Sequence, residues 1–196
     1  MPSFLIDVPQ YNTPDAKAYV TEQLKELIAM LEDTFHQKFQ EEELVPILQR
    51  ENASKACYER CLKNLRTHHY PSTLTMQMYM LFASHMNIGT PEILHFYQQM
   101  EAETAAAPEF HGTNILWVHL LPYYQETLKE YFNLTDDYQI QAIEMNLDYR
   151  APLDTEHPLE ALALRKSLQT TSTSPCRTQV QPAASFLVCS LIFIEY

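Results

Sequence analysis

The sequence predicts a mainly α-helical protein that leads into a βαβ unit. Apolar residues recur at helical spacing through most of residues 1–110. The short apolar run Asn114 to Leu121, bounded by a glycine and a proline, is typical of a buried parallel strand. A second β-rich run follows at Tyr138 to Met145, after a stretch with helical spacing. Residues 113–145 should therefore form two parallel strands joined by a helix in a right-handed crossover.

The composition divides the chain into three regions. Residues 1–110 are the helical region, residues 111–169 are a partial α/β region that ends in a helix, and residues 170–196 are an anomalous tail. The tail begins as a polar, turn-rich segment and ends in the apolar run SFLVCSLIFI. This run has ten residues, whereas a membrane-spanning helix needs about 20. It could be a last strand, an interface segment, or sequence unrelated to the fold, for example after a frameshift.

Two N-terminal helices follow from periodicity and start signals. The first begins at Pro14, and its apolar stripe is Val20, Leu24, Leu27, Leu31 and Phe35. Glu41 to Glu43 are a favourable first turn for the second helix, because acidic groups suit the positive end of the helix dipole. Its later part, Ala53 to Arg66, places apolar residues on one face, namely Tyr58, Leu62 and Leu65.

Two further helices are expected in the helical region. Thr73 to Asn87 is apolar almost all round and rich in methionine, which favours a buried helix. A methionine-rich face can also serve as an adaptable binding surface, but core packing is the favoured interpretation. The next helix has Thr90 as its cap and Pro91 at its first position, and it should run to about Ala107.

Composition excludes several classes of function. With 25 acidic against 13 basic residues the net charge is −12, and no basic run is present, so nucleic-acid binding is not expected. The chain has two glycines, which excludes a glycine-rich phosphate loop. The first ten residues lack the features of a secretory signal, so we expect a cytoplasmic protein that does not enter a membrane.

Two acid–histidine pairs and two cysteines have spacings found in metal sites. Asp33 with His36, and Glu92 with His95, match the acid-x-x-His spacing of di-iron bundles, but both pairs lie opposite the apolar face of their helix, so we expect them in solvent. Cys57 and Cys61 are four residues apart on one helix. An iron–sulfur cluster needs three or four thiolates, so structural cysteines are the favoured interpretation. No metal ligand is predicted.

One histidine lies where open α/β sheets bind ligands. His119 is at the carboxyl end of the predicted strand at residues 114–121, and the turn at Leu120 to Tyr124 follows it. A packed or capped histidine is the favoured interpretation. If the turn does border a site, His119, Pro122 and Tyr123 are the candidate residues for one wall of it.

Several segments, in order, resemble one known family. They are PSFLIDVPQYNTPDAKAYVTEQLKELIAMLED, LQRENASKACYERCLKNLR, NILWVHLLPYYQETLKEYF and, after the second strand, PLDTEHPLEALALR. Together they are similar to the middle of the 2-hydroxyacyl-CoA dehydratase and benzoyl-CoA reductase family, over roughly Pro2 to Leu168. The resemblance rests on their order rather than on one diagnostic motif. It implies that the α/β part belongs to a flavodoxin-like domain.

The resemblance also implies an activity and partners. Family members are two-subunit enzymes of anaerobic metabolism, in which cysteines bind a [4Fe-4S] cluster and a separate ATP-dependent activator supplies a low-potential electron. The acyl-CoA thioester becomes a ketyl radical, after which a 2-hydroxy group leaves or an aromatic ring is reduced. The implied partners are a sister subunit, the activator and the acyl-CoA substrate.

The chain departs from the family pattern in its cysteines. Cys57 and Cys61 occur in a helical stretch where the family has no ligand, and the surroundings of Cys176 and Cys189 do not match those of family ligands. We therefore expect an internal fragment of a dehydratase or reductase subunit that binds no cluster and is inactive alone.

The alternative is a non-catalytic helical interaction module whose methionine-rich face binds a partner. Exposure of Met76, Met80 and Leu81 discriminates between the two, because burial of this helix favours the enzyme fragment and an exposed groove favours the module.

Overall fold

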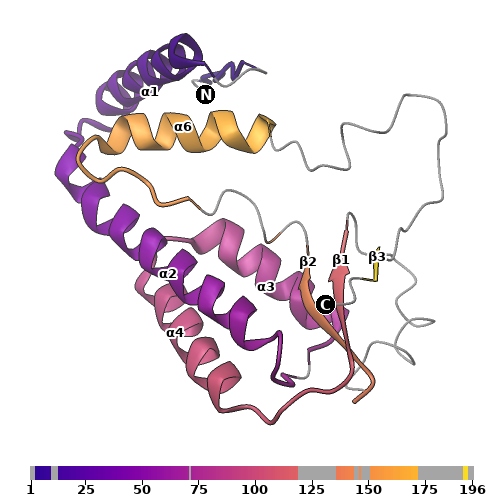
Figure 1. Cartoon of the computed structure of the whole chain (residues 1–196). Coiled ribbons are helices and arrows are strands. Elements are labelled where there is room, and N and C mark those ends of the chain that lie inside the picture. The colour runs from indigo at the N-terminus through magenta and orange to yellow at the C-terminus, as the bar shows by residue number, and fades with distance from the viewer. Residues whose placement is uncertain are drawn as a thin grey trace, which may run out of the picture. The chain divides into compact units, whose positions relative to one another are not determined.

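The structure is a computed structural model that describes residues 3–9, 13–70, 72–118, 136–143, 146, 151–171 and 192–193. It is mainly α-helical, with a partial α/β unit formed by a small sheet (Figure 1). Within these residues no helix is both long and apolar enough to cross a membrane. The chain divides into two compact units, residues 1–49 with 149–185 and residues 50–148 with 186–196. These units cut across the three regions expected from composition, which stay a prediction.

The first unit is built on helices α1, Pro14–Phe35, and α6, Pro158–Thr171. Thr13 caps α1, because its side-chain oxygen accepts a hydrogen bond from the backbone N–H of Ala16 at 3.1 Å. The two helices lie side by side (Figure 1), and Lys17 of α1 forms an ion pair with Glu160 of α6 at 2.7 Å. Val20 is fully buried in this unit.

A short 3₁₀ helix, η1, Glu41–Glu43, leads into α2, Leu44–Asn64, whose first turn includes Pro46. A proline is tolerated there because the first turn of a helix has no intrahelical acceptor for its N–H groups. In the first unit Leu48 of α2 packs with Leu153 and with Ala161 of α6. The acidic residues predicted as the first turn of this helix instead form the 3₁₀ helix that precedes it.

The apolar stripe predicted on the first helix is only partly buried. Val20 is buried and Leu24 and Leu27 are half-buried, but Leu31 is 39% exposed and Phe35 is 66% exposed. The expectation that the whole stripe packs in a core is therefore wrong for its last two residues. The described part of α6 packs beside α1, and the apolar face of α1 continues into a surface groove.

The second unit contains most of α2 together with α3, Leu74–Asn87, and α4, Pro91–Ala106. Thr90 caps α4 and Pro91 is its first residue, as predicted. One core cluster joins α2 and α4 through their buried faces, namely Cys57, Tyr58, Cys61, Ile93, Tyr97 and Met100. The rings of Tyr58 and Tyr97 meet at 5.5 Å between centroids. The helix faces predicted from spacing are confirmed here.

The sheet of the second unit has the strand order β2-β1-β3, with β1 at Thr113–Trp117, β2 at Tyr138–Ile143 and β3 at Ile192–Phe193. Strands β1 and β2 are parallel, and β3 pairs antiparallel with β1. The predicted parallel pairing of the two strands is confirmed. The helix predicted between them lies outside the described residues.

One extra residue in β2 sets which side chains share a face. Ile115 pairs with Ile140 and Leu116 pairs with Ala142, so Gln141 has no partner in the register. Because side chains alternate along a strand, this insertion returns Ile143 to the face of Ile140. Leu81 of α3 joins that face in a core cluster with both strands, formed with Ile115, Trp117, Ile140 and Ile143.

Helix α3 is not buried as its composition predicts. Its buried residues are Gln77, Leu81 and Ser84, at helical spacing, whereas the opposite side exposes large apolar side chains. The exposed fractions are 49% for Met76, 67% for Tyr79, 57% for Phe82 and 80% for Met86. The prediction of a buried helix is wrong for this opposite side, because the helix packs in the unit through one side. We call Met76, Tyr79, Phe82 and Met86 the α3 stripe.

Candidate functional site

The predicted wall residues follow the carboxyl end of β1. The strand ends at Trp117, which is 4% exposed and fixed between Ile143 of β2 and the core. His119, Pro122 and Tyr123 lie outside the described residues, so their role stays a prediction. In the described part of the chain, β1 and β2 end side by side in the same direction at this edge.

The two acid–histidine pairs lie on exposed helix faces. Asp33 and His36 are exposed, and His36 ends α1 with a left-handed φ of 54°. Glu92 and His95 are exposed on α4. Among the residues that the structure describes, no three His, Cys, Asp or Glu side chains come close enough to hold a metal ion. The prediction that both pairs face solvent is confirmed.

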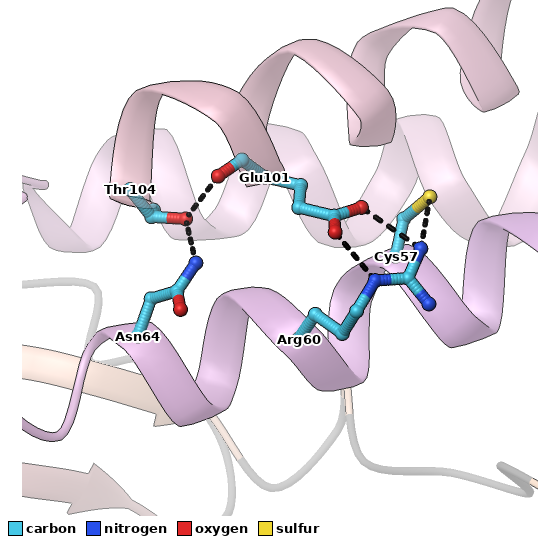
Figure 2. A network of polar contacts seen from close by, with 5 residues as sticks. All are labelled: Cys57, Arg60, Asn64, Glu101 and Thr104. Carbon is cyan, nitrogen blue, oxygen red and sulfur yellow. Dashed lines mark hydrogen bonds and ion pairs between the residues drawn. The ribbon is translucent and has the colours of Figure 1, made fainter. Parts of the chain in front are cut away.

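Cys57 and Cys61 of α2 pack against α4 in the core cluster. Figure 2 shows the polar contacts between these two helices that include Cys57. Arg60 of α2 forms a two-point ion pair with Glu101 of α4, and its Nη2 also donates to Cys57 Sγ at 3.3 Å. Along the same pair of helices, Asn64 donates to the Thr104 hydroxyl at 3.2 Å. These polar contacts join α2 to α4 beside the apolar core cluster of the two helices.

The surroundings of both thiols favour the neutral form. Cys57 is 4% exposed and Cys61 is fully buried, and both are free thiols. Burial, with a smaller contribution from Glu101, raises the pKa of Cys57, although Arg60 opposes the shift. Burial raises the pKa of Cys61 to about 11. Since the thiolate is the metal ligand and the nucleophile, these two cysteines are poorly suited to either role.

A buried glutamine at the opposite edge of the sheet was not anticipated from the sequence. Gln139, 4% exposed, donates through Nε2 to the Leu65 carbonyl at 2.7 Å and to the His68 carbonyl at 3.0 Å. It also donates to Asn114 Oδ1 at 2.9 Å, and its own oxygen accepts from the backbone N–H of Tyr70 at 3.0 Å. Gln139 thereby fixes the segment after α2 against the amino ends of both strands. The one sequence signal is a glutamine within a β-rich run.

His69 is held in the same corner. Its ring stacks on Phe110 at 5.1 Å between centroids, and its backbone N–H donates to the Pro108 carbonyl at 2.8 Å. Gly112 is required beside it, because an added Cβ would lie 2.4 Å from the Asp137 carbonyl oxygen and 2.6 Å from the Phe110 ring. His69, Phe110 and Gly112 are therefore closely packed, which favours a structural role for this corner.

The chain matches one known family over most of its length. The sequence model of the family described as 2-hydroxyglutaryl-CoA dehydratase, D-component, matches residues 1–188. No curated protein and no solved structure matches the chain. The family match extends past Leu168, the approximate end of the resemblance found in the sequence.

Proposed function

Because the chain belongs to the 2-hydroxyglutaryl-CoA dehydratase D-component family, we propose that it contributes part of a subunit that acts on 2-hydroxyacyl-CoA thioesters in the cytoplasm. The reaction would be radical dehydration, or the related reduction, driven by an ATP-dependent activator and carried out with a sister subunit. The family match over residues 1–188 is the observation that carries this proposal.

The sheet supports a ligand site at the carboxyl end of β1. Parallel strands β1 and β2 end at the same edge, and open α/β sheets bind ligands at that edge. We propose that they begin a flavodoxin-like domain and that His119, Pro122 and Tyr123 form one wall of the acyl-CoA site. The buried side chains of Trp117 and Ile143 would give this wall a rigid support.

The described residues do not fit a [4Fe-4S] cluster. A cluster needs three or four thiolates, whereas Cys57 and Cys61 are buried thiols with raised pKa values. Our proposal is therefore that cluster ligation and catalysis depend on cysteines supplied by other protein segments or subunits. Such a dependence would make this chain inactive when it is tested alone.

Two measurements test the proposal. Anaerobic reconstitution of the 196-residue chain with iron and sulfide should leave no stoichiometric cluster absorption, and a full cluster would contradict it. In calorimetric titration of the chain together with its sister subunit, His119→Ala should weaken 2-hydroxyacyl-CoA binding about tenfold. The control His95→Ala, at an exposed histidine of α4, should leave binding unchanged. Equal affinity of both variants would contradict the proposed wall.

A second candidate function is favoured by the α3 stripe. Four exposed apolar side chains at successive turns of one helix form the kind of face that binds a partner helix. The three residues chosen to discriminate between the enzyme fragment and the interaction module give a mixed result. Met76 is exposed, Met80 is half-buried and Leu81 is buried. The exposed part supports a non-catalytic interaction module, but it equally suits the docking face of a subunit.

The sister subunit distinguishes these two roles. If the α3 stripe is its docking face, Tyr79→Glu with Phe82→Glu should abolish co-purification of the two subunits, while Glu92→Gln should not. If the double variant still binds the subunit with unchanged affinity, the stripe belongs to another interaction.

A further inference from the structure

A second apolar surface lies on the first unit. It is a groove with a volume of about 350 Å³, lined by the end of α1, the link after it and the start of α2. We call it the α1–α2 groove. Its apolar lining is Ile28, Leu31, Phe35, Phe39, Leu44 and Ile47. Exposure is substantial, at 66% for Phe35, 40% for Phe39 and 38% for Ile47.

Residues 36–40 connect α1 to η1, with residues 37–40 lining one side of the groove, and they are held by specific contacts. His36 ends α1 in the left-handed conformation, so the chain turns back across the end of the helix. Glu32 then accepts a hydrogen bond from the Phe39 backbone N–H at 2.9 Å and forms an ion pair with Lys38 at 2.8 Å. These two contacts hold the pKa of Glu32 below its usual range. The groove is therefore formed before any ligand binds.

The rim of the groove is acidic. Glu43 is a lining residue, and the exposed carboxylates of Glu41 and Glu42 come directly before it in the chain. The one lysine of the lining, Lys38, is already paired with Glu32. Such a rim repels phosphate groups, so a nucleotide, a CoA or an anionic membrane is a poor occupant. A basic ligand is favoured for the same reason.

We propose that the α1–α2 groove binds a basic amphipathic helix of a partner protein, with an apolar side chain such as leucine or phenylalanine inserted between Phe35, Phe39 and Ile47. The lysines or arginines beside that anchor would meet the carboxylates of residues 41–43. Apolar burial gives the affinity in this recognition mode, and charge complementarity gives the choice of partner and the rate of association. The surface is distinct from the α3 stripe, so this inference does not depend on the proposed catalytic role.

A synthetic helix tests the inference on the full chain. The probe is a fluorescein-labelled peptide of leucine and lysine, with leucine at helical spacing, and the readout is fluorescence anisotropy. We expect saturable binding at physiological salt that weakens as salt is raised, because Coulomb attraction is screened. A control peptide with glutamate in place of lysine should bind at least about tenfold more weakly.

Matched variants locate the binding. Phe35→Ala should weaken binding of the lysine peptide about tenfold. Tyr79→Ala, at an exposed aromatic residue of the α3 stripe, should leave the affinity unchanged. Glu42→Gln with Glu43→Gln should reduce both the affinity and its salt dependence. Glu92→Gln with Glu109→Gln makes the same charge change in the second unit and should alter neither. Phe35 is mostly exposed, so its replacement should leave the circular dichroism spectrum unchanged.

Three results would overturn the inference. They are no saturable binding of the lysine peptide, equal affinity of Phe35→Ala and the parent chain, and equal affinity for the lysine and glutamate peptides. Amide chemical shifts in an isotope-labelled chain give an independent readout, since they should change at residues 28–47. Shifts confined to the second unit would assign the peptide to another surface.

Discussion

At the scale of single residues, buried polar side chains fix much of the described structure. Gln139 is buried and hydrogen-bonds to the Leu65 carbonyl, and Glu51 and Lys55 form an ion pair whose side chains are largely buried. A buried polar group is costly when it loses its partner, so these residues make the chain sensitive to single substitutions. They were invisible to pattern analysis, because a glutamine or glutamate on a helix or strand is usually in solvent.

Replacement of Gln139 by leucine should destabilise the second unit strongly. The change removes the two N–H groups of Nε2, which three acceptors share, together with one accepted bond, and it leaves the carbonyls of Leu65 and His68 without this donor. We expect a loss of about 3 kcal/mol in the free energy of unfolding. Urea unfolding measures it. Gln141→Leu, which removes a single bond to the Leu62 carbonyl, should cost about 1 kcal/mol, and equal losses would contradict the role of Gln139.

The pair of Glu51 and Lys55 should show strong coupling. The two charges are 2.8 Å apart, with side chains 2% and 11% exposed. Glu51→Gln leaves the buried ammonium of Lys55 without this countercharge and should cost about 3 kcal/mol. The double replacement of both residues by methionine should cost less than the single one, because no buried charge remains. Additive losses in a double-mutant cycle would show that the pair is not coupled.

At the scale of helices and strands, local signals predicted much of the fold. Thr90 and Pro91 marked the start of α4, and the spacing of Ile93, Tyr97 and Met100 gave its buried face. The parallel pairing of β1 and β2 followed from two apolar runs separated by a helix-length segment. Such signals work because capping and periodicity are properties of adjacent residues.

The failures at this scale have one physical cause. Whether an apolar face is covered depends on residues far away in the sequence, so composition alone made α3 a buried helix and the end of the α1 stripe a core element. The structure exposes Tyr79, Met86 and Phe35. The candidate site could be placed at the end of a strand by topology, but its side-chain geometry could not be predicted from a single sequence.

The cap of α1 gives a prediction at this scale. Thr13 accepts a hydrogen bond from Ala16, and Thr13→Ala removes that acceptor from the first turn. The expected loss is about 1 kcal/mol in the free energy of unfolding. Thr13→Ser keeps the hydroxyl and should recover most of it. A serine variant as unstable as the alanine variant would show that the methyl group, rather than the cap, matters.

At the scale of the whole molecule, the acidic composition governs the response to pH. Most carboxylates are exposed, but several form hydrogen bonds or ion pairs that favour their charged form, including those of Glu32, Glu101 and Asp154. The family match also belongs to this scale, since it covers residues 1–188. No single motif would have identified the family.

Acid should destabilise the chain, in part through Glu101. The Arg60 guanidinium holds the pKa of Glu101 below its usual range, so the folded state binds fewer protons there than the unfolded state. The stabilisation is complete above the unfolded value near 4.5 and is lost as pH falls through the lower folded value. Urea unfolding at neutral pH and at about pH 3.5 should show a smaller drop for Glu101→Gln than for the parent. Glu92→Gln should leave the drop unchanged, and an unchanged drop in both variants would contradict the assignment.

The first unit draws its residues from two distant parts of the chain, and this affects how the protein folds while it is being synthesised. Lys17 of α1 and its partner Glu160 of α6 are about 140 residues apart. A ribosome adds roughly 5–20 residues per second, so α1 waits about 7–30 s for α6 to emerge. During that time the apolar side chains around Val20 have no α6 to pack against. The nascent chain should therefore bind chaperones first through its N-terminal helix, and it should release them only when α6 has left the ribosome.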